Sequence, residues 1–302
     1  MSGYVKLVLT AVFWAGAFFT GKYSVMHAPP IAAAFLRFLI AGILLIALLF
    51  YYRAWPDLKI KGLFLRYIWL AFTGIFLYNA FFFSGLHGTS TINGSLLAGA
   101  NPGITALINR LYYKEKLGAR RWAGIVLSFS GVALVVTGGS FEKLISLKIN
   151  PSDLLILFAV VCWAVYTVSG KSAIALSSAV AATAFACSIG ALMLFFPAAY
   201  QASSSDLIWV RDWIFWASIL YMSIFASALA YIWWYQGVRQ IGSSRSAIFI
   251  NLVPVGVMLM SSFSGIVPDS VQITGAVFIL AGVFLTASNG KSSTAQAIRN
   301  RN

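Results

Sequence analysis

Residues 13–22 read FWAGAFFTGK, and residues 162–171 read CWAVYTVSGK. Tryptophan, alanine, glycine and lysine occupy the same places in both stretches, at an offset of 149 residues. Each stretch lies inside an apolar run of about twenty residues, which is the length of helix that crosses the hydrocarbon core of a bilayer. The two stretches therefore predict a helical membrane protein that contains an internal duplication.

The composition of the whole chain supports a membrane protein. Its 302 residues are 60% hydrophobic and 9% charged, with a mean hydropathy of +0.87, so they carry more apolar surface than a soluble core could bury. The apolar runs are continuous and do not alternate with polar residues, which favours helices over a β-barrel. We therefore expect an all-α integral membrane protein with ten transmembrane helices, at 4–25, 30–52, 66–87, 93–112, 119–137, 152–172, 178–200, 212–237, 245–264 and 268–288.

Further matched residues extend the duplication through both halves. At offsets of 151 or 152 residues, they are Gly85 and Pro102 with Gly237 and Pro254, and Gly124 and Gly131 with Gly275 and Gly282. Because five spans is an odd number, the second half enters the membrane in the opposite sense, which predicts two inverted five-helix repeats of the kind found in secondary transporters. The expected divisions are a first repeat at 1–138, a linker at 139–150, a second repeat at 151–289 and a disordered cytoplasmic tail at 290–302.

The distribution of positive charge predicts the orientation. The net charge of +14 comes from 21 Lys and Arg residues. With the N-terminus in the cytoplasm, sixteen of them fall in or beside cytoplasmic segments, four lie outside and one, Arg37, lies within a span. This asymmetry places both termini in the cytoplasm. The basic residues form no basic face with stacking aromatics, so we expect lipid and a small solute as partners, and no nucleic acid.

Five motifs in order carry a family resemblance. They are Phe13-Trp14-Ala15, Phe35-Leu36-Arg37-Phe38, Asn101-Pro102, Lys114-Glu115-Lys116-Leu117 and Gly124 with Gly131. With the duplication, they make residues 4–288 resemble the drug/metabolite transporter superfamily, in its ten-span EamA type. The resemblance implies alternating-access transport, export and a bacterial inner membrane. The second half has Ala186 and Ile266 at the positions of Arg37 and Glu115, so any role of those two residues belongs to one half only.

Two prolines are predicted to interrupt matched helices near the membrane midplane. Pro102 and Pro254 each remove a backbone hydrogen bond and free carbonyl groups. They could mark the solute path, with Asn101 and Asn251 as hydrogen-bonding groups beside the kinks. Alternatively, they only set packing curvature, because proline is common in membrane helices.

Trp14 and Trp163 lie near the centres of their spans, although tryptophan usually prefers the interface. One interpretation makes them symmetry-related walls of a central cavity, with Tyr166 on the same helix face as Trp163. The other packs each ring between helices, with its N–H bonded to a carbonyl.

Three basic side chains are candidates for function. Arg37 lies about 10 Å inside its span, counted as seven residues from Pro30 at 1.5 Å each, and a charge there is costly enough to suggest a role. It could bind a carboxylate on the solute, or it could bond to carbonyls of neighbouring helices. Lys22 and Lys171 lie at opposite membrane faces, where they either extend to the interface or act as gates.

Two aromatic clusters occupy matched helices: Tyr78, Asn79 and His87 in the first half, with Tyr231, Trp233, Trp234 and Tyr235 in the second. Their positions nearer the two faces favour an interfacial belt. Tyr78 and Asn79 could instead contact a solute together with Tyr231 and Trp234.

Acidic residues are expected only in loops and at span ends, so no carboxylate is predicted at the midplane to carry a proton or bind sodium. We find no HExxH, GxSxG or nucleotide-binding motif, and expect no enzyme activity, no catalytic residue, no cofactor and no metal. The sequence favours a carrier of small metabolites such as amino acids. Lipophilic drugs, sugar-type metabolites, an intramembrane enzyme or a receptor remain alternatives. The oligomeric state stays open and is compatible with a monomer.

Overall fold

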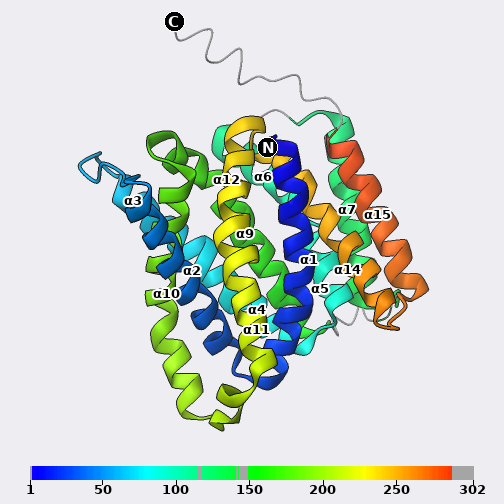
Figure 1. Cartoon of the computed structure of the whole chain (residues 1–302). Helices are drawn as coiled ribbons and strands as arrows, with labels where there is room; N and C mark the ends of the chain where they lie inside the picture. The colour runs from blue at the N-terminus through cyan, green and yellow to red at the C-terminus, as the bar shows by residue number, and fades with distance from the viewer. Residues whose placement is uncertain (1, 115–116, 141, 143–148, 288–302) are drawn as a thin grey trace, which may run out of the picture.

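The computed structural model describes residues 2–114, 117–140, 142 and 149–287, and every regular element in these residues is a helix (Figure 1). Eight of the described helical segments are long and apolar enough to cross a membrane, and Ser270–Thr286 is a shorter apolar helix. The helical class is therefore confirmed. The count of ten spans and the inverted relation of the halves stay predictions, and the predicted tail at 290–302 lies outside the described residues.

The first half begins with α1, which Ser2 caps by accepting a hydrogen bond from the Val5 N–H. Pro30 occupies the first turn of α2, where its missing N–H leaves no bond unmade. The helices of this half are α1 (Gly3–His27), α2 (Pro30–Tyr51), α3 (Leu63–Leu70), η1 (Ala71–Leu77), α4 (Tyr78–Gly88), α5 (Thr91–Ala98), α6 (Asn101–Tyr113) and α7 (Ala119–Thr137).

The second half begins with α9, which has a proline, Pro151, in its first turn. Its elements are α9 (Pro151–Leu176), α10 (Ala179–Ser203), η2 (Leu207–Arg211), α11 (Trp213–Tyr221), η3 (Met222–Leu229), α12 (Ala230–Ile241), α13 (Ser243–Ile248), η4 (Phe249–Asn251), α14 (Leu252–Phe263) and α15 (Ser270–Ala287).

The third helix of each half contains a π-helical segment at the same place. In the first half η1 joins α3 to α4, and in the second half η3 joins α11 to α12. A π turn widens the helix and is often found at functional sites. Gly74 in η1 has no side chain where the Tyr166 ring packs, since a Cβ there would overlap that ring.

The fourth helix of each half is interrupted. In the first half α5 ends at Ala98 and α6 begins at Asn101, so Pro102 lies in the first turn of α6. In the second half the 3-10 segment η4 joins α13 to α14, and Pro254 lies in the first turn of α14. Both prolines therefore start the second piece of a broken helix, a position at which proline is well tolerated.

The most extensive packing between helices joins the two halves: α7 with α15, α2 with α10, α4 with α9, and α1 with α12. In Figure 1, α7 and α15 run side by side along one edge of the bundle. Glycines allow this close contact: a Cβ on Gly131 would lie 2.7 Å from the carbonyl oxygen of Gly275.

Candidate solute-binding site

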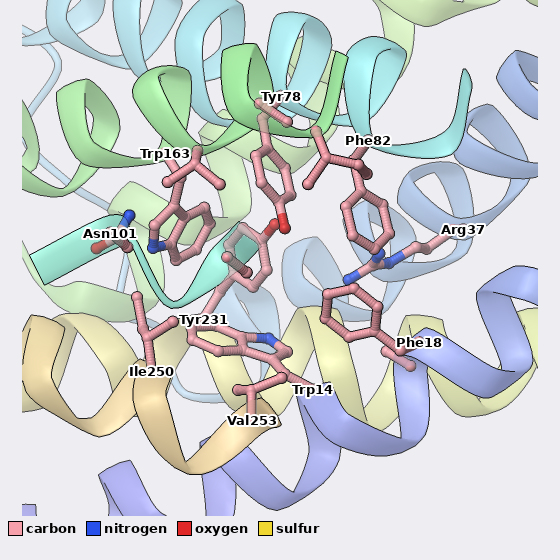
Figure 2. Close-up of a pocket in the computed structure, with 15 residues that line it drawn as sticks. Trp14, Phe18, Arg37, Tyr78, Phe82, Asn101, Trp163, Tyr231, Ile250 and Val253 are labelled. Carbon is pink, nitrogen blue, oxygen red and sulfur yellow. The ribbon is translucent and has the colours of Figure 1, made fainter. Parts of the chain in front are cut away.

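A small cavity lies between the two halves, with walls from α1, α2, α4, α5, α6, α9, α12, η4 and α14 (Figure 2). Its volume is about 50 Å³, which is room for a few water molecules at roughly 10–15 Å³ each. A metabolite-sized solute therefore requires this space to widen.

Six of the predicted binding residues line this cavity: Trp14, Arg37, Tyr78, Asn101, Trp163 and Tyr231. The other four, Asn79, Tyr166, Trp234 and Asn251, lie outside its lining. Tertiary packing thus brings together side chains from six different helices, α1, α2, α4, α6, α9 and α12.

Arg37 places a positive charge at one end of the cavity. Its side chain is 3% exposed, and its Nε and Nη2 atoms donate to the Ser227 hydroxyl at 2.6 Å and to the Ala226 carbonyl at 3.2 Å. Both partners belong to η3. Among the described residues no carboxylate pairs with Arg37, so its charge is uncompensated and its remaining N–H groups are available to a ligand.

The two symmetry-related tryptophans differ in their hydrogen bonding. Trp14 donates its N–H to the Ala226 carbonyl at 3.0 Å. The Trp163 N–H is buried and has no partner within the described part of the chain. In the first half, the π segment's Ile75 carbonyl accepts instead from the Asn79 amide at 2.9 Å. The Ala226 carbonyl of η3 therefore binds Trp14 and Arg37 of the first half. The Ile75 carbonyl of η1 does not bind Trp163 of the second half, whose indole N–H stays free at the cavity.

Asn101 and two tyrosines complete the polar groups of the cavity. The Asn101 Oδ1 accepts from the Thr105 hydroxyl at 3.0 Å, and its Nδ2 has no partner among the residues described. Because a threonine hydroxyl can donate or accept, this amide can present either of its groups to a solute. In Figure 2 the Trp163 nitrogen is turned toward Asn101, and the hydroxyls of Tyr78 and Tyr231 point into the space between Trp163 and Arg37.

Buried aromatic rings surround the lining residue Tyr231. Tyr166, Tyr231, Trp234 and Tyr235 are each at most 1% exposed, and the Trp234 N–H donates to the Thr167 hydroxyl at 3.2 Å. The interfacial-belt interpretation is therefore wrong for Tyr231, Trp234 and Tyr235, and also for Asn79, which is 0% exposed. The reason is that packing covers these side chains: Trp234 bonds to Thr167 of α9, and Asn79 bonds to the Ile75 carbonyl of η1.

Another part of the cavity lining is formed by Phe18 and Phe82, whose rings meet edge to face at 5.2 Å. Sequence reasoning did not select these residues. Helical periodicity could have found them, because Phe18 lies one turn beyond Trp14 and Phe82 one turn beyond Tyr78. Both rings are therefore part of the wall that a solute would contact.

The two candidate gate lysines bind at opposite ends of the bundle. Lys22 donates to the carbonyls of Leu86, His87 and Thr89 at 2.8–2.9 Å, so it caps the end of α4. Lys171 donates to the Asn109 Oδ1 at 3.0 Å, and its ammonium lies 4.6 Å from the centre of the Tyr113 ring. Both lysines contact protein groups outside the cavity lining.

The amides of the two remaining candidates bond to irregular helix turns. Asn79 binds η1 as described above, and Asn251 donates to the Ile248 carbonyl at 2.9 Å beside η4. Among the described residues, no group of three or more His, Cys, Asp or Glu side chains is arranged to hold a metal ion.

Comparisons with known proteins identify the family. The model of the EamA-like transporter family matches residues 1–137 and again residues 150–288. "Uncharacterized transporter YyaM" of Bacillus subtilis is 35% identical over 285 residues, covering 94% of this chain and 93% of the relative. An "Uncharacterized transporter" of Archaeoglobus fulgidus is 31% identical, covering 94% of this chain and 97% of its own length.

A solved structure described only as "Crystal structure of protein" has a TM-score of 0.66 and covers 98% of each chain. At 18% identity, this likeness shows the fold alone. The family match and the named relatives confirm the resemblance found in the sequence motifs, and they indicate a transporter, not an enzyme. The chain is a multi-pass membrane protein and belongs to the EamA-like transporter family.

Proposed function

We propose that this transporter works by alternating access, with ten helices in two inverted repeats that move against each other around the central cavity. Three matched features of the halves support this arrangement: the π segments η1 and η3, the interrupted fourth helices, and the reciprocal packing of α1 with α12 and of α4 with α9. We place the protein in a bacterial inner membrane, and the excess of Lys and Arg in the predicted cytoplasmic segments supports cytoplasmic termini.

The observation that carries the proposal is the uncompensated Arg37 charge in a cavity built by both halves. A buried charge without a counterion is unfavourable, and an intramembrane arginine is a site candidate for that reason. Aromatic rings around it suit an apolar body, so the solute is a small amphipathic metabolite with a carboxylate. Amino acids and related acids are the first class to test, and export is the expected direction. Uncharged sugars or lipophilic drugs would leave Arg37 without a counterion.

Counterflow in liposomes tests this function. Liposomes that contain the purified protein and are loaded with an unlabelled amino acid or related acid should accumulate the labelled solute, with saturable kinetics. Arg37→Ala should abolish exchange of carboxylated solutes while the protein still purifies as a monodisperse peak. Arg37→Lys should retain part of the exchange, and Arg211→Ala, at an exposed residue outside the cavity, is the matched control. Equal losses of stability and transport in Arg37→Ala would assign the arginine to folding.

The symmetry is tested by accessibility. With the native cysteines replaced, single cysteines at Trp14 and Trp163 should react from opposite sides of the membrane in different states, and one solute should protect both over the same concentration range. We further propose that Lys22 and Lys171 hold the gates at the two ends. A cysteine at either tryptophan that stays inert from both sides, with and without solute, contradicts the central cavity.

A further inference from the structure

We propose that the central site selects organic anions, namely carboxylates without an ammonium group, over zwitterionic amino acids and over amines. This inference rests on the proposed carrier function and specifies the solute class of the same cavity. The observation behind it is the balance of charges and hydrogen-bond groups that face the cavity.

The cavity lining contains one cation and, among the described residues that form it, no carboxylate. The side chains from α1, α4, α5, α9, η4 and α14 are apolar or aromatic. Those from α6 and α12 are the neutral Asn101 and Tyr231, and α2 contributes Arg37. A solute with a net charge of −1 therefore neutralises the site, whereas a zwitterion leaves one positive charge in excess.

A buried acidic group, Asp153, lies outside the lining and already has a hydrogen-bond partner. Asp153 is one turn beyond the lining residue Ile156, is 2% exposed, and accepts from the Thr89 hydroxyl. The Thr89 carbonyl in turn accepts from the Lys22 ammonium at 2.8 Å. Asp153 and Lys22 thus both bond to Thr89 at one end of α4, and Asp153 lies outside the lining that contains Arg37.

The free hydrogen-bond groups of the cavity also favour an anion. The Trp163 N–H is a donor that lacks a partner in the described part of the chain, the Asn101 amide can present its Nδ2, and Arg37 adds further N–H groups. Indole and guanidinium groups can only donate. An ammonium group would find aromatic faces, which attract cations weakly, but it would also meet the repulsion of Arg37.

Three carbon skeletons, each in three charge forms, test the proposal without altering the protein. The hydroxy acids are lactate, 2-hydroxy-4-methylpentanoate and 3-phenyllactate; the amino acids are alanine, leucine and phenylalanine; and the amines are ethylamine, 3-methylbutylamine and phenethylamine. Binding is measured by thermal stabilisation of the purified protein and by inhibition of counterflow. We expect the hydroxy acid to bind about 10-fold or more tightly than its matched amino acid on at least one skeleton, the effect of a charge-assisted hydrogen bond without opposing repulsion.

Three variants assign the preference to its cause. Arg37→Gln should lose the preference for the hydroxy acid, and Arg37→Lys should keep its direction. Asp153→Asn should leave it unchanged. If the amino acid binds as tightly as the hydroxy acid on all three skeletons, or if Asp153→Asn alone weakens amino acid binding, the anion proposal is overturned although the carrier function stands.

A separate measurement distinguishes failure of the carrier function from failure of the anion proposal. Accessibility of cysteines placed at Trp14 and Trp163 reports alternation between states without using any of the nine compounds as substrate. Alternation without binding of any hydroxy acid overturns the anion proposal alone, and the absence of alternation overturns the proposed function as well.

Discussion

Deleting the indole N–H at one tryptophan should affect ligand binding, and deleting it at the other should affect stability. Replacing Trp14 or Trp163 with β-(3-benzothienyl)alanine puts sulfur in place of the N–H and keeps the size of the ring. The Trp14 N–H donates to the Ala226 carbonyl, whereas the Trp163 N–H has no partner among the residues described. The two replacements therefore remove the same atoms from different environments.

The expected magnitudes follow from these environments. At Trp14 the change removes one neutral hydrogen bond, worth about 1 kcal/mol. Ala226 keeps its bond from Arg37, so no carbonyl is left bare. At Trp163 the change removes a buried donor that costs about 1–3 kcal/mol while it is unsatisfied, so the empty protein should be as stable as the unmodified one or more so. Solute affinity should fall about 2- to 10-fold at Trp163 only.

Thermal unfolding in detergent at one fixed scan rate, with and without a bound carboxylate, measures both effects. The melting temperature should drop by about 2 °C for the change at Trp14 and should not drop for the change at Trp163, whose ligand-induced shift should shrink instead. Equal destabilisation at both positions, with unchanged affinity at Trp163, would refute the assignment of a free donor at the cavity.

Three further predictions concern topology and packing. In a background without the native cysteines, a thiol reagent added to intact cells should modify Ser204→Cys and spare Gly118→Cys, and the reverse pattern contradicts cytoplasmic termini. Gly131→Leu should reduce the free energy of unfolding by about 1–3 kcal/mol and lower the melting temperature. The reason is that a Cβ at position 131 would meet the Gly275 carbonyl. Wild-type stability of this variant would contradict the close packing of α7 and α15. Lys22→Met should lower the free energy of unfolding by about 1 kcal/mol, a small value because the lysine is only partly buried. Lys22→Arg should recover most of this loss. If Lys22→Met is as stable as Lys22→Arg, the three carbonyl contacts are not needed.

Span positions could be predicted well from the sequence. The expected span at 119–137 matches α7 at Ala119–Thr137, and the expected span at 30–52 matches α2 at Pro30–Tyr51. In a bilayer, each helix must satisfy its own backbone hydrogen bonds over the apolar thickness, so local hydrophobicity and length are sufficient to locate it. The duplication was equally visible, because matched residues at a nearly constant offset need no knowledge of contacts.

The grouping of side chains around the cavity depended on the tertiary structure. Sequence placed Trp14 and Trp163 in equivalent positions, yet only Trp14 donates to a π-segment carbonyl of the other half, whereas the corresponding carbonyl of η1 accepts from Asn79. The sequence also placed Tyr231 near a membrane face. In the structure Tyr231 is buried instead, close in the chain to Ser227 of η3, which binds Arg37. Which way a residue points around a membrane helix is decided by the neighbouring helices, here more than 150 residues away along the chain. Hydrophobicity therefore determined that these helices exist, and packing between the halves determined which polar groups were left free to bind a solute.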